Sequence, residues 1–471
     1  MKAAFFTLGC KLNFAETSAI GRALAEHGVE RAAEGEIPDI AVVNTCSVTA
    51  MADKKCRQLI NRLHRQWPSA SIVVTGCYAQ LQPSEVAALP GVSVVLGSGQ
   101  KLRAVQYAEQ WLRSHGPEEN SANVAVEVAA RPESLGFEPS CERGDRTRWF
   151  LKVQDGCDRF CTYCTIPYAR GRSRSPRIAD IVSQAREAAS RGAKEIILTG
   201  VNIGDFGRRN ANGGEGYGET FFDLARRLDE VEGIERYRIS SIEPDLLDPQ
   251  LIEWVAKESR AFMPHFHIPL QSGSDAVLRL MARRYDTALF ADRIAAIKEL
   301  MPDAFIGVDV IAGARGETER EWEASRRFIE ELPVTRLHVF PYSFPGETDA
   351  EHRQSLDFCR EMRFARMHVF PYSERPGTSA LRLSDAVDQA TKHRRVEVLT
   401  QLSARKLNEF IQGSLGQVRP VLWETERHGV MSGLTDNYLR VEMPGAEALH
   451  NTITNVKLVR GDGETVYGES V

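Results

Sequence analysis

The chain has 471 residues, of which 42% are hydrophobic and 26% are charged, and its formal net charge at pH 7 is −5. This length predicts about three domains, and the near-balanced charge excludes RNA binding by a uniformly basic surface, so any RNA contact must use local patches. No apolar run approaches the ~18 residues of a membrane span, and the apolar region at the start of the chain is too short for a signal peptide. The nine cysteines of such a chain are expected to be reduced thiols in the cytoplasm.

The first hundred residues alternate apolar runs with helical patterns. Strands are expected at residues 3–8, 40–44, 71–75 and 92–96, and helices at 17–27, 53–67 and 84–89. This alternation predicts an α/β domain over residues 1–114, built as a doubly wound parallel sheet with helices on both faces.

Three of these strands end in a cysteine, namely Cys10, Cys46 and Cys77. Ligands of open α/β sheets bind outside the carboxyl ends of the strands, so the three thiols are expected to meet at one edge of the sheet. They could form a three-thiolate site, or they could be buried structural cysteines, because free cysteine is among the most buried residue types. The other cysteines outside residues 157–164 have no such placement and are interpreted as incidental: Cys56, Cys141 and Cys359.

Residues 115–145 are polar and rich in Glu, Ser and Pro, and are expected to form a linker. A second α/β region follows over residues 146–412. Its strands are expected at residues 149–154, 195–199, 237–241, 266–270, 307–312 and 336–342. A series of this kind predicts a full or partial (β/α) barrel with its ligands at the carboxyl ends of the strands.

Cys157, Cys161 and Cys164 follow the first strand of this second region. Three thiolates at this spacing can hold three irons of a [4Fe–4S] cluster. No fourth cysteine lies in the run, so one iron would be open to a small ligand. A zinc site is the alternative, although zinc usually takes four ligands in paired sets and no second pair lies nearby.

A duplicated unit lies near the end of the barrel region. Residues 316–343 and 346–373 are identical at 14 of 28 positions, and each copy reads as a turn, a helix and a strand. One supersecondary unit is therefore repeated. The second copy could add a seventh strand to the barrel or pack outside it, and a neutral tandem duplication is the favoured interpretation. Residues 413–471 then change to short β-like runs between Gly, Asn and Asp, which predicts a small all-β barrel.

The Cys-x₃-Cys-x-aromatic-Cys run, with Tyr163 in the aromatic position, resembles the signature of radical S-adenosylmethionine enzymes. The resemblance implies that the open iron binds S-adenosylmethionine and that an electron donor such as flavodoxin or ferredoxin supplies the electron. A glycine and three polar residues at or after the strand ends are candidates for further cofactor contacts: Gly200, Asn202, Glu243 and Gln271. The alternative for each is a loop residue whose polar groups bond to backbone or water.

Further motifs resemble the methylthiotransferase family over nearly the whole length. They are Thr-Leu-Gly-Cys-Lys-Leu-Asn at 7–13, Asn-Thr-Cys-Ser-Val-Thr at 44–49, Gly-Cys-Tyr-Ala-Gln at 76–80, Ile-Pro-Tyr-Ala-Arg-Gly at 166–171, Ile-Pro-Leu-Gln-Ser-Gly-Ser at 268–274 and Met-Ala-Arg-Arg-Tyr at 281–285. The family implies an auxiliary [4Fe–4S] cluster on Cys10, Cys46 and Cys77, a radical S-adenosylmethionine barrel and a C-terminal TRAM barrel. The family normally has one turn–helix–strand unit where this chain has two. The resemblance therefore does not establish whether the barrel closes.

The motifs at 7–13 and 44–49 are most similar to the branch that acts on N6-threonylcarbamoyladenosine at position 37 of tRNA. The implied reaction is insertion of a methylthio group at C2 of the adenine. The alternatives are the branch acting on isopentenyladenosine-37, the branch acting on a ribosomal protein side chain, and a zinc-bearing RNA-binding protein without catalysis.

Two basic stretches are candidates for contact with RNA. One lies just after the cluster loop and contains Arg170, Arg172, Arg174 and Arg177. Arg binds phosphate in a bidentate manner, so these side chains could contact the tRNA backbone or a cofactor carboxylate, or form a solvated loop. The other is a helix after Cys46, which could contact the anticodon stem or be solvated: Lys54, Lys55, Arg57, Arg62 and Arg65.

Overall fold

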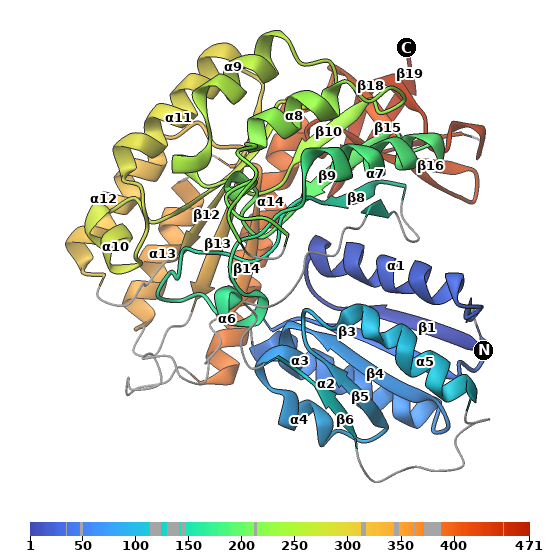
Figure 1. Ribbon diagram of the computed structural model, residues 1–471. Coiled ribbons are helices and arrows are strands. Elements are labelled where there is room, and N and C mark those ends of the chain that lie inside the picture. Colours follow the sequence, from blue (N-terminus) through green and yellow to red (C-terminus); the bar gives the residue numbers. More distant parts are fainter. Residues whose placement is uncertain are drawn as a thin grey trace.

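The computed structural model describes residues 1–471 except 34, 48–49, 114–123, 130–140, 143–146, 212–213, 312–316, 343–347, 362–363, 372–387 and 446. Along the chain it forms a parallel sheet covered by helices, an open barrel of parallel strands and a small closed β-barrel (Figure 1). No helix among the described residues combines the length and the apolar character needed to cross a membrane.

The N-terminal sheet has the strand order β2-β1-β3-β4-β5-β6, with every neighbouring pair parallel. Its strands are β1 (Lys2–Thr7), β2 (Glu30–Arg31), β3 (Ile40–Thr45), β4 (Ser71–Gly76), β5 (Val92–Leu96) and β6 (Ala125–Glu127). Its helices are α1 (Lys11–Glu26), α2 (Ala50–Gln66), α3 (Cys77–Leu81), α4 (Pro83–Ala87) and α5 (Ala104–Arg113).

The predicted doubly wound sheet is confirmed, and the packing of β3 shows its physical basis. Val42 packs with residues of α1 and α5 on one face, whereas Ala41 and Val43 pack with α2, α3 and α4 on the other. Successive side chains of a strand point to opposite faces, so a sheet covered on both sides requires a continuous apolar run rather than an alternating one.

The stretch expected as a linker contributes strands to both neighbouring sheets. β6 pairs with β5 at the edge of the N-terminal sheet, and β7 (Cys141–Glu142) pairs antiparallel with β8 (Trp149–Lys152) of the barrel. Cys141, expected in a polar connection, is instead a buried member of the barrel core. The rest of this stretch lies largely outside the described residues.

The predicted partial barrel is confirmed. Two sheets, β10-β9-β8-β7 and β11-β12-β13-β14, are joined by bridges between Tyr237 and Phe262 and between Ser241 and His267. The remaining strands are β9 (Glu195–Thr199), β10 (Arg236–Ile239), β11 (His265–Gln271), β12 (Phe305–Ile311), β13 (Arg336–Tyr342) and β14 (Arg366–Pro371). The helices of this region are α6 (Ile166–Arg170), α7 (Ile178–Ser190), α8 (Phe221–Asp229), α9 (Pro249–Lys257), α10 (Asp275–Leu280), α11 (Thr287–Leu300), α12 (Glu319–Glu330) and α13 (Asp349–Glu361).

The duplicated unit adds a parallel strand to the barrel, which decides between the two alternatives left by the sequence. β13 and β14 pair in the register of the repeat, with Arg336 opposite Arg366 and His338 opposite His368. β8 to β14 are thus seven parallel strands in the described part of the chain. The residues at which the turns of the two copies begin, Gly316 and Gly346, lie outside the described residues, and so do residues 372–387 after β14.

The free edge of β14 is covered by the long helix α14 (Gln389–Ser414). Within α14, the Ser403 hydroxyl accepts a hydrogen bond from the Met367 N–H at 3.0 Å and donates one to the Met367 carbonyl oxygen at 2.7 Å. One side chain therefore satisfies both backbone groups of a residue on the edge strand, and a covered edge does not pair with other chains.

Deletion of residues 344–373 is expected to leave a folded protein. β13 then becomes the edge strand, and Leu337, which lies opposite Met367, takes the position that Ser403 contacts. Because the two strands share most of their sequence, α14 can pack on β13, and the thermal midpoint is expected to fall by no more than about 4 °C. Differential scanning calorimetry measures the shift; an insoluble deletion variant beside a soluble wild type would show that the second copy is structurally required.

The C-terminal segment is a closed barrel with the order β15-β16-β17-β19-β18, as the sequence predicts. Its strands are β15 (Val418–Arg427), β16 (Val430–Thr435), β17 (Arg440–Pro444), β18 (Ile453–Asp462) and β19 (Thr465–Ser470). It contacts the amino ends of the large barrel's strands, where the Tyr438 ring lies 5.1 Å from the ring of His265 and 4.5 Å from the Arg238 guanidinium. The opposite ends of those strands carry the site described next.

Candidate active site

The cysteines at 157, 161 and 164 lie in the loop between β8 and α6, at the carboxyl end of β8. Cys161 is buried and the other two are partly buried. Burial, followed by the nearby thiols, raises the pKa of Cys157 to about 12 and that of Cys164 to about 11. The three sulfurs thus lie close enough to influence one another, and a positive charge is what would favour their thiolate forms.

Arg283 supplies such a charge. Its guanidinium donates to Cys161 Sγ at 3.1 Å and to the Tyr163 hydroxyl at 3.3 Å, and it forms a close ion pair with Glu243. Arg283 follows α10 and Glu243 follows β10, so residues distant in sequence converge on the cysteine loop. From the sequence, Arg283 stands out only as part of the motif at 281–285. Its contact with the cysteine loop could not be predicted without the fold.

Of the five candidate cofactor residues, two lie beside Arg283 and three lie at other strand ends. Glu243 and Tyr163 adjoin Arg283 beside the cysteine loop, and burial raises the pKa of Glu243 above its ordinary value. Asn202 is buried, and its amide donates to Asp205 at 2.8 Å within its own turn. A Cβ on Gly200 would lie 2.7 Å from Ile203 Cγ2, so close packing of the chain by itself accounts for this glycine. Gln271 ends β11 with a φ of 70°, a backbone strain typical of functional sites.

The second group of cysteines lies at the carboxyl ends of β1, β3 and β4. Cys10 precedes α1, Cys46 follows β3 and Cys77 begins α3. The sheet order reverses between β1 and β3, the point at which open α/β sheets bind ligands. A Cβ on Gly9 would lie 2.7 Å from Cys46 Sγ, which places the residue before Cys10 directly against Cys46. The structure therefore brings these three cysteines to one edge.

Asn13 connects this edge to the barrel. Its amide donates to the carbonyl oxygens of Leu8 at 2.9 Å and Thr45 at 3.0 Å, so it ties together the loops that carry Cys10 and Cys46. Its side-chain oxygen accepts from Arg170 Nη2 at 2.5 Å. The residue that orders one cysteine group thus contacts the segment that follows the other.

A buried ionic network surrounds this contact. Glu16, one helical turn after Asn13, accepts from Arg170 at 3.0 Å and from Lys152 at 2.9 Å, and it also pairs closely with Lys101. Asp155 pairs with Lys152 at 2.8 Å, Arg174 at 3.0 Å and Arg170 at 3.1 Å.

The network carries more positive than negative charge. Burial alone would raise the pKa of Glu16, but Arg170, Lys101 and Lys152 together hold it well below its ordinary value. Four basic side chains thus surround two carboxylates. Burial raises the pKa of Cys77 above its ordinary value, and the charges of Arg170 and Lys101 reduce that rise. The excess cations therefore lie beside the N-terminal cysteine group.

The interpretation of Arg170 and Arg174 as contacts of the tRNA backbone or as solvated loop residues is wrong, and contact with a cofactor carboxylate stays a prediction. Arg170 is 1% exposed and Arg174 is 3% exposed, because Glu16 and Asp155 pair with them inside the domain interface. Arg172 remains partly exposed, with its guanidinium over the Phe160 ring at 4.9 Å, and Arg177 is exposed over the Tyr217 ring at 4.4 Å.

The basic side chains of α2 are largely exposed. Lys54, Lys55, Arg62 and Arg65 face solvent, whereas Arg57 pairs with Glu85 at 2.8 Å. The four exposed residues are therefore available to a partner, and contact with RNA stays a prediction.

Two protein-family models match the two domains that carry the cysteine groups. The model described as uncharacterized protein family UPF0004 matches residues 2–97, and the radical SAM superfamily model matches residues 151–329. Among solved structures, the radical S-adenosylmethionine methyltransferase TsrM from Kitasatospora setae superposes with a TM-score of 0.54 over 72% of each chain at 13% identity, a likeness of fold.

Curated relatives align over nearly the whole chain. The threonylcarbamoyladenosine tRNA methylthiotransferase MtaB of Bacillus subtilis is 37% identical over 97% of this chain and 93% of its own length. The protein of the same name from Aquifex aeolicus is 33% identical, with 94% and 97% covered. The tRNA-2-methylthio-N(6)-dimethylallyladenosine synthase of Desulfotalea psychrophila is 31% identical, with 91% and 89% covered. Similarity at this level over both cysteine-bearing domains leaves one assignment: the chain is an enzyme of the radical S-adenosylmethionine methylthiotransferase family.

Proposed function

We propose that this enzyme transfers a methylthio group to C2 of N6-threonylcarbamoyladenosine at position 37 of tRNA. The observation that carries the substrate is the alignment over 97% of the chain with a relative named for that activity. The motifs at 7–13 and 44–49 point to the same branch.

The two cysteine groups suit two iron–sulfur clusters. Cys157, Cys161 and Cys164 would hold the cluster that binds S-adenosylmethionine, and Cys10, Cys46 and Cys77 would hold an auxiliary cluster. The donor chemistry fits, because each group offers three thiols beside cationic side chains, Arg283 for the first and Arg170 with Lys101 for the second. When bound, the first cluster and S-adenosylmethionine supply radical chemistry and the second cluster supplies sulfur.

The side chains around the clusters orient and insulate them. Arg283 donates to Cys161 Sγ and is itself held by Glu243, so the loop has one preferred arrangement at the barrel rim. Asn13, Glu16 and Arg170 fix the edge of the N-terminal sheet against the carboxyl end of β8. Their burial keeps water out of the interface between the two sites.

The tRNA and an electron donor complete the system. Lys54, Lys55, Arg62 and Arg65 form an exposed basic face of α2 that suits a phosphate backbone. Adenine C2 is reachable in the barrel only if the base leaves its stack, which an anticodon loop permits at small cost. The electron would come from a separate protein such as flavodoxin or ferredoxin.

The nucleoside composition of tRNA tests the assignment. A strain that lacks this gene is expected to lose the 2-methylthio derivative of threonylcarbamoyladenosine and to accumulate the unmodified form, as measured by mass spectrometry of digested tRNA. Complementation by the wild type restores the modification, and complementation by Cys161→Ala does not. Loss of the methylthio-isopentenyl nucleoside instead, or an unchanged nucleoside profile, would overturn the substrate.

A further inference from the structure

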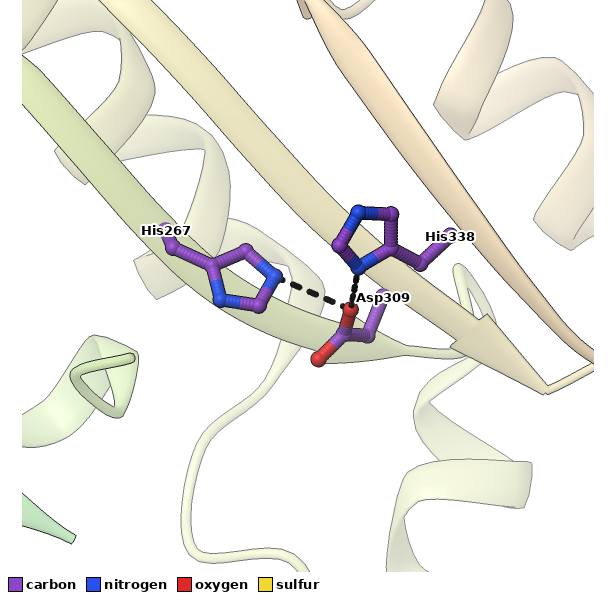
Figure 2. A group of neighbouring side chains, drawn as sticks. All are labelled: His267, Asp309 and His338. Atoms are coloured by element: carbon purple, nitrogen blue, oxygen red, sulfur yellow. Dashed lines mark hydrogen bonds and ion pairs between the residues drawn. The ribbon is translucent and has the colours of Figure 1, made fainter. Parts of the chain in front are cut away.

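Two histidines and an aspartate converge inside the large barrel, on strands whose ends carry none of the six cysteines. His267 on β11, Asp309 on β12 and His338 on β13 come from three neighbouring strands (Figure 2). Asp309 Oδ1 lies 2.9 Å from His267 Nε2 and 2.9 Å from His338 Nδ1. One atom from each side chain lies within 4.8 Å of the others, a spacing that suits ligands of one metal ion.

The strand pattern directs these side chains inward. Ile268 and Leu270 of β11, and Val308 and Val310 of β12, belong to the core formed with the helices. Since successive residues of a strand face opposite sides, His267 and Asp309 face the barrel interior. The space between them is kept by Gly307, where a Cβ would lie 3.0 Å from the His267 ring.

A further partner fixes the orientation of one imidazole. His267 Nδ1 lies 2.6 Å from the Ser241 hydroxyl, which leaves Nε2 directed at Asp309. Metal-ligating histidines almost always bond a second partner through the other ring nitrogen, and this bond sets the tautomer and the direction of the ligand. Ser241 gives His267 that arrangement.

The cluster is partly open and contains one carboxylate. The side chains of His267, Asp309 and His338 are 20%, 18% and 21% exposed, which leaves room for further ligands. Burial opposes ionisation of Asp309, but the two histidines hold its pKa below the ordinary range. Burial also lowers the pKa of His338 below its ordinary value. The positive charge of Arg336 disfavours a bound cation. Its guanidinium, however, lies over the Phe305 ring at 5.2 Å, at the start of β12.

We propose that His267, Asp309 and His338 form a site for one divalent transition-metal ion, separate from the iron–sulfur clusters. Two imidazoles and one carboxylate suit Zn²⁺ or Fe²⁺ and disfavour Mg²⁺ and Ca²⁺, which prefer oxygen ligands alone. Three protein ligands with open positions are the pattern of catalytic rather than structural zinc sites. The open positions face the barrel interior, where an oxygen ligand can reach the ion. This geometry is the same whichever substrate the enzyme modifies.

Zinc analysis of the full-length, anaerobically reconstituted protein tests the site. After equilibrium dialysis against Zn²⁺, about one zinc per chain is expected while bound iron stays unchanged. Zinc K-edge absorption is expected to show nitrogen and oxygen ligands at about 2.0–2.1 Å and no sulfur at about 2.3 Å. The absence of sulfur separates this site from zinc captured by the cysteines.

Variants locate the ion. His338→Ala and Asp309→Asn are each expected to weaken zinc binding at least tenfold, with iron content and circular dichroism like those of the wild type. The matched control is His450→Ala, which removes an exposed histidine of the C-terminal barrel and should keep the zinc. Zinc below about a tenth of an equivalent in the wild type, a sulfur shell, or zinc retained by His338→Ala would each overturn the site and leave a hydrogen-bonded cluster. None of these readouts uses tRNA activity.

Discussion

The Cys161→Ala variant is expected to form no 5′-deoxyadenosine from S-adenosylmethionine. Cluster binding at residues 157–164 relies on three thiolates, and the substitution leaves two. It also removes the sulfur that accepts from Arg283 at 3.1 Å. Iron bound after anaerobic reconstitution is expected to fall from about eight to about four per chain, since each cluster holds four. Chromatographic quantification of 5′-deoxyadenosine and iron analysis measure the two effects on the same sample.

Cys359→Ala is the matched control, because Cys359 is also a buried thiol but belongs to the outer core of the barrel. It should keep both 5′-deoxyadenosine formation and the full iron content. Cleavage of S-adenosylmethionine by Cys161→Ala would rule out the loop as the cofactor site. A wild-type protein that binds only about four irons would instead rule out the auxiliary cluster. The two outcomes therefore test the two cysteine groups independently.

Glu16→Gln is expected to uncouple the two cysteine groups. S-adenosylmethionine cleavage should persist, because the loop at 157–164 and Arg283 are untouched, whereas methylthiolation of tRNA should fall about 100-fold. The substitution leaves Lys101, Lys152 and Arg170 around a neutral amide in a buried interface. Removal of one partner of a buried ion pair costs about 3–5 kcal/mol, which weakens the contact between the domains. The ratio of methylthiolated tRNA to 5′-deoxyadenosine is the measurement.

Arg22→Ala provides the control for this experiment. Arg22 on α1 pairs with Glu187 on α7 at 3.5 Å across the same two domains, but the side chains are 35% and 53% exposed. Such surface pairs contribute about 0–1 kcal/mol, so the product ratio should stay near that of the wild type. If Glu16→Gln keeps full methylthiolation, the network does not position the sites. If both activities fall equally, the effect is general destabilisation rather than uncoupling.

The sequence by itself determined the features that depend on local pattern. Cys157, Cys161 and Cys164 lie within one loop, so their spacing indicates a shared site before any fold is known. The strands of the N-terminal sheet are continuous apolar runs because both faces are covered, and their ends carry Cys10, Cys46 and Cys77. The rule that parallel strands place their carboxyl ends at one edge then sufficed to bring these cysteines together. The small β-barrel followed from its short strands and turns.

Only the tertiary structure decided which charged and polar residues meet. Glu16 and Arg170 lie 154 positions apart, and no periodicity in the chain relates them. An arginine in a polar loop is ordinarily solvated, and Arg170 is buried because a carboxylate from another domain compensates the cost of removing its charge from water. The cluster of His267, Asp309 and His338 likewise depends on the register of three strands. The sequence revealed the duplication, but hydrogen bonding along β13 placed its second copy within the barrel wall, because an edge strand offers unpaired backbone groups to a closely similar neighbour.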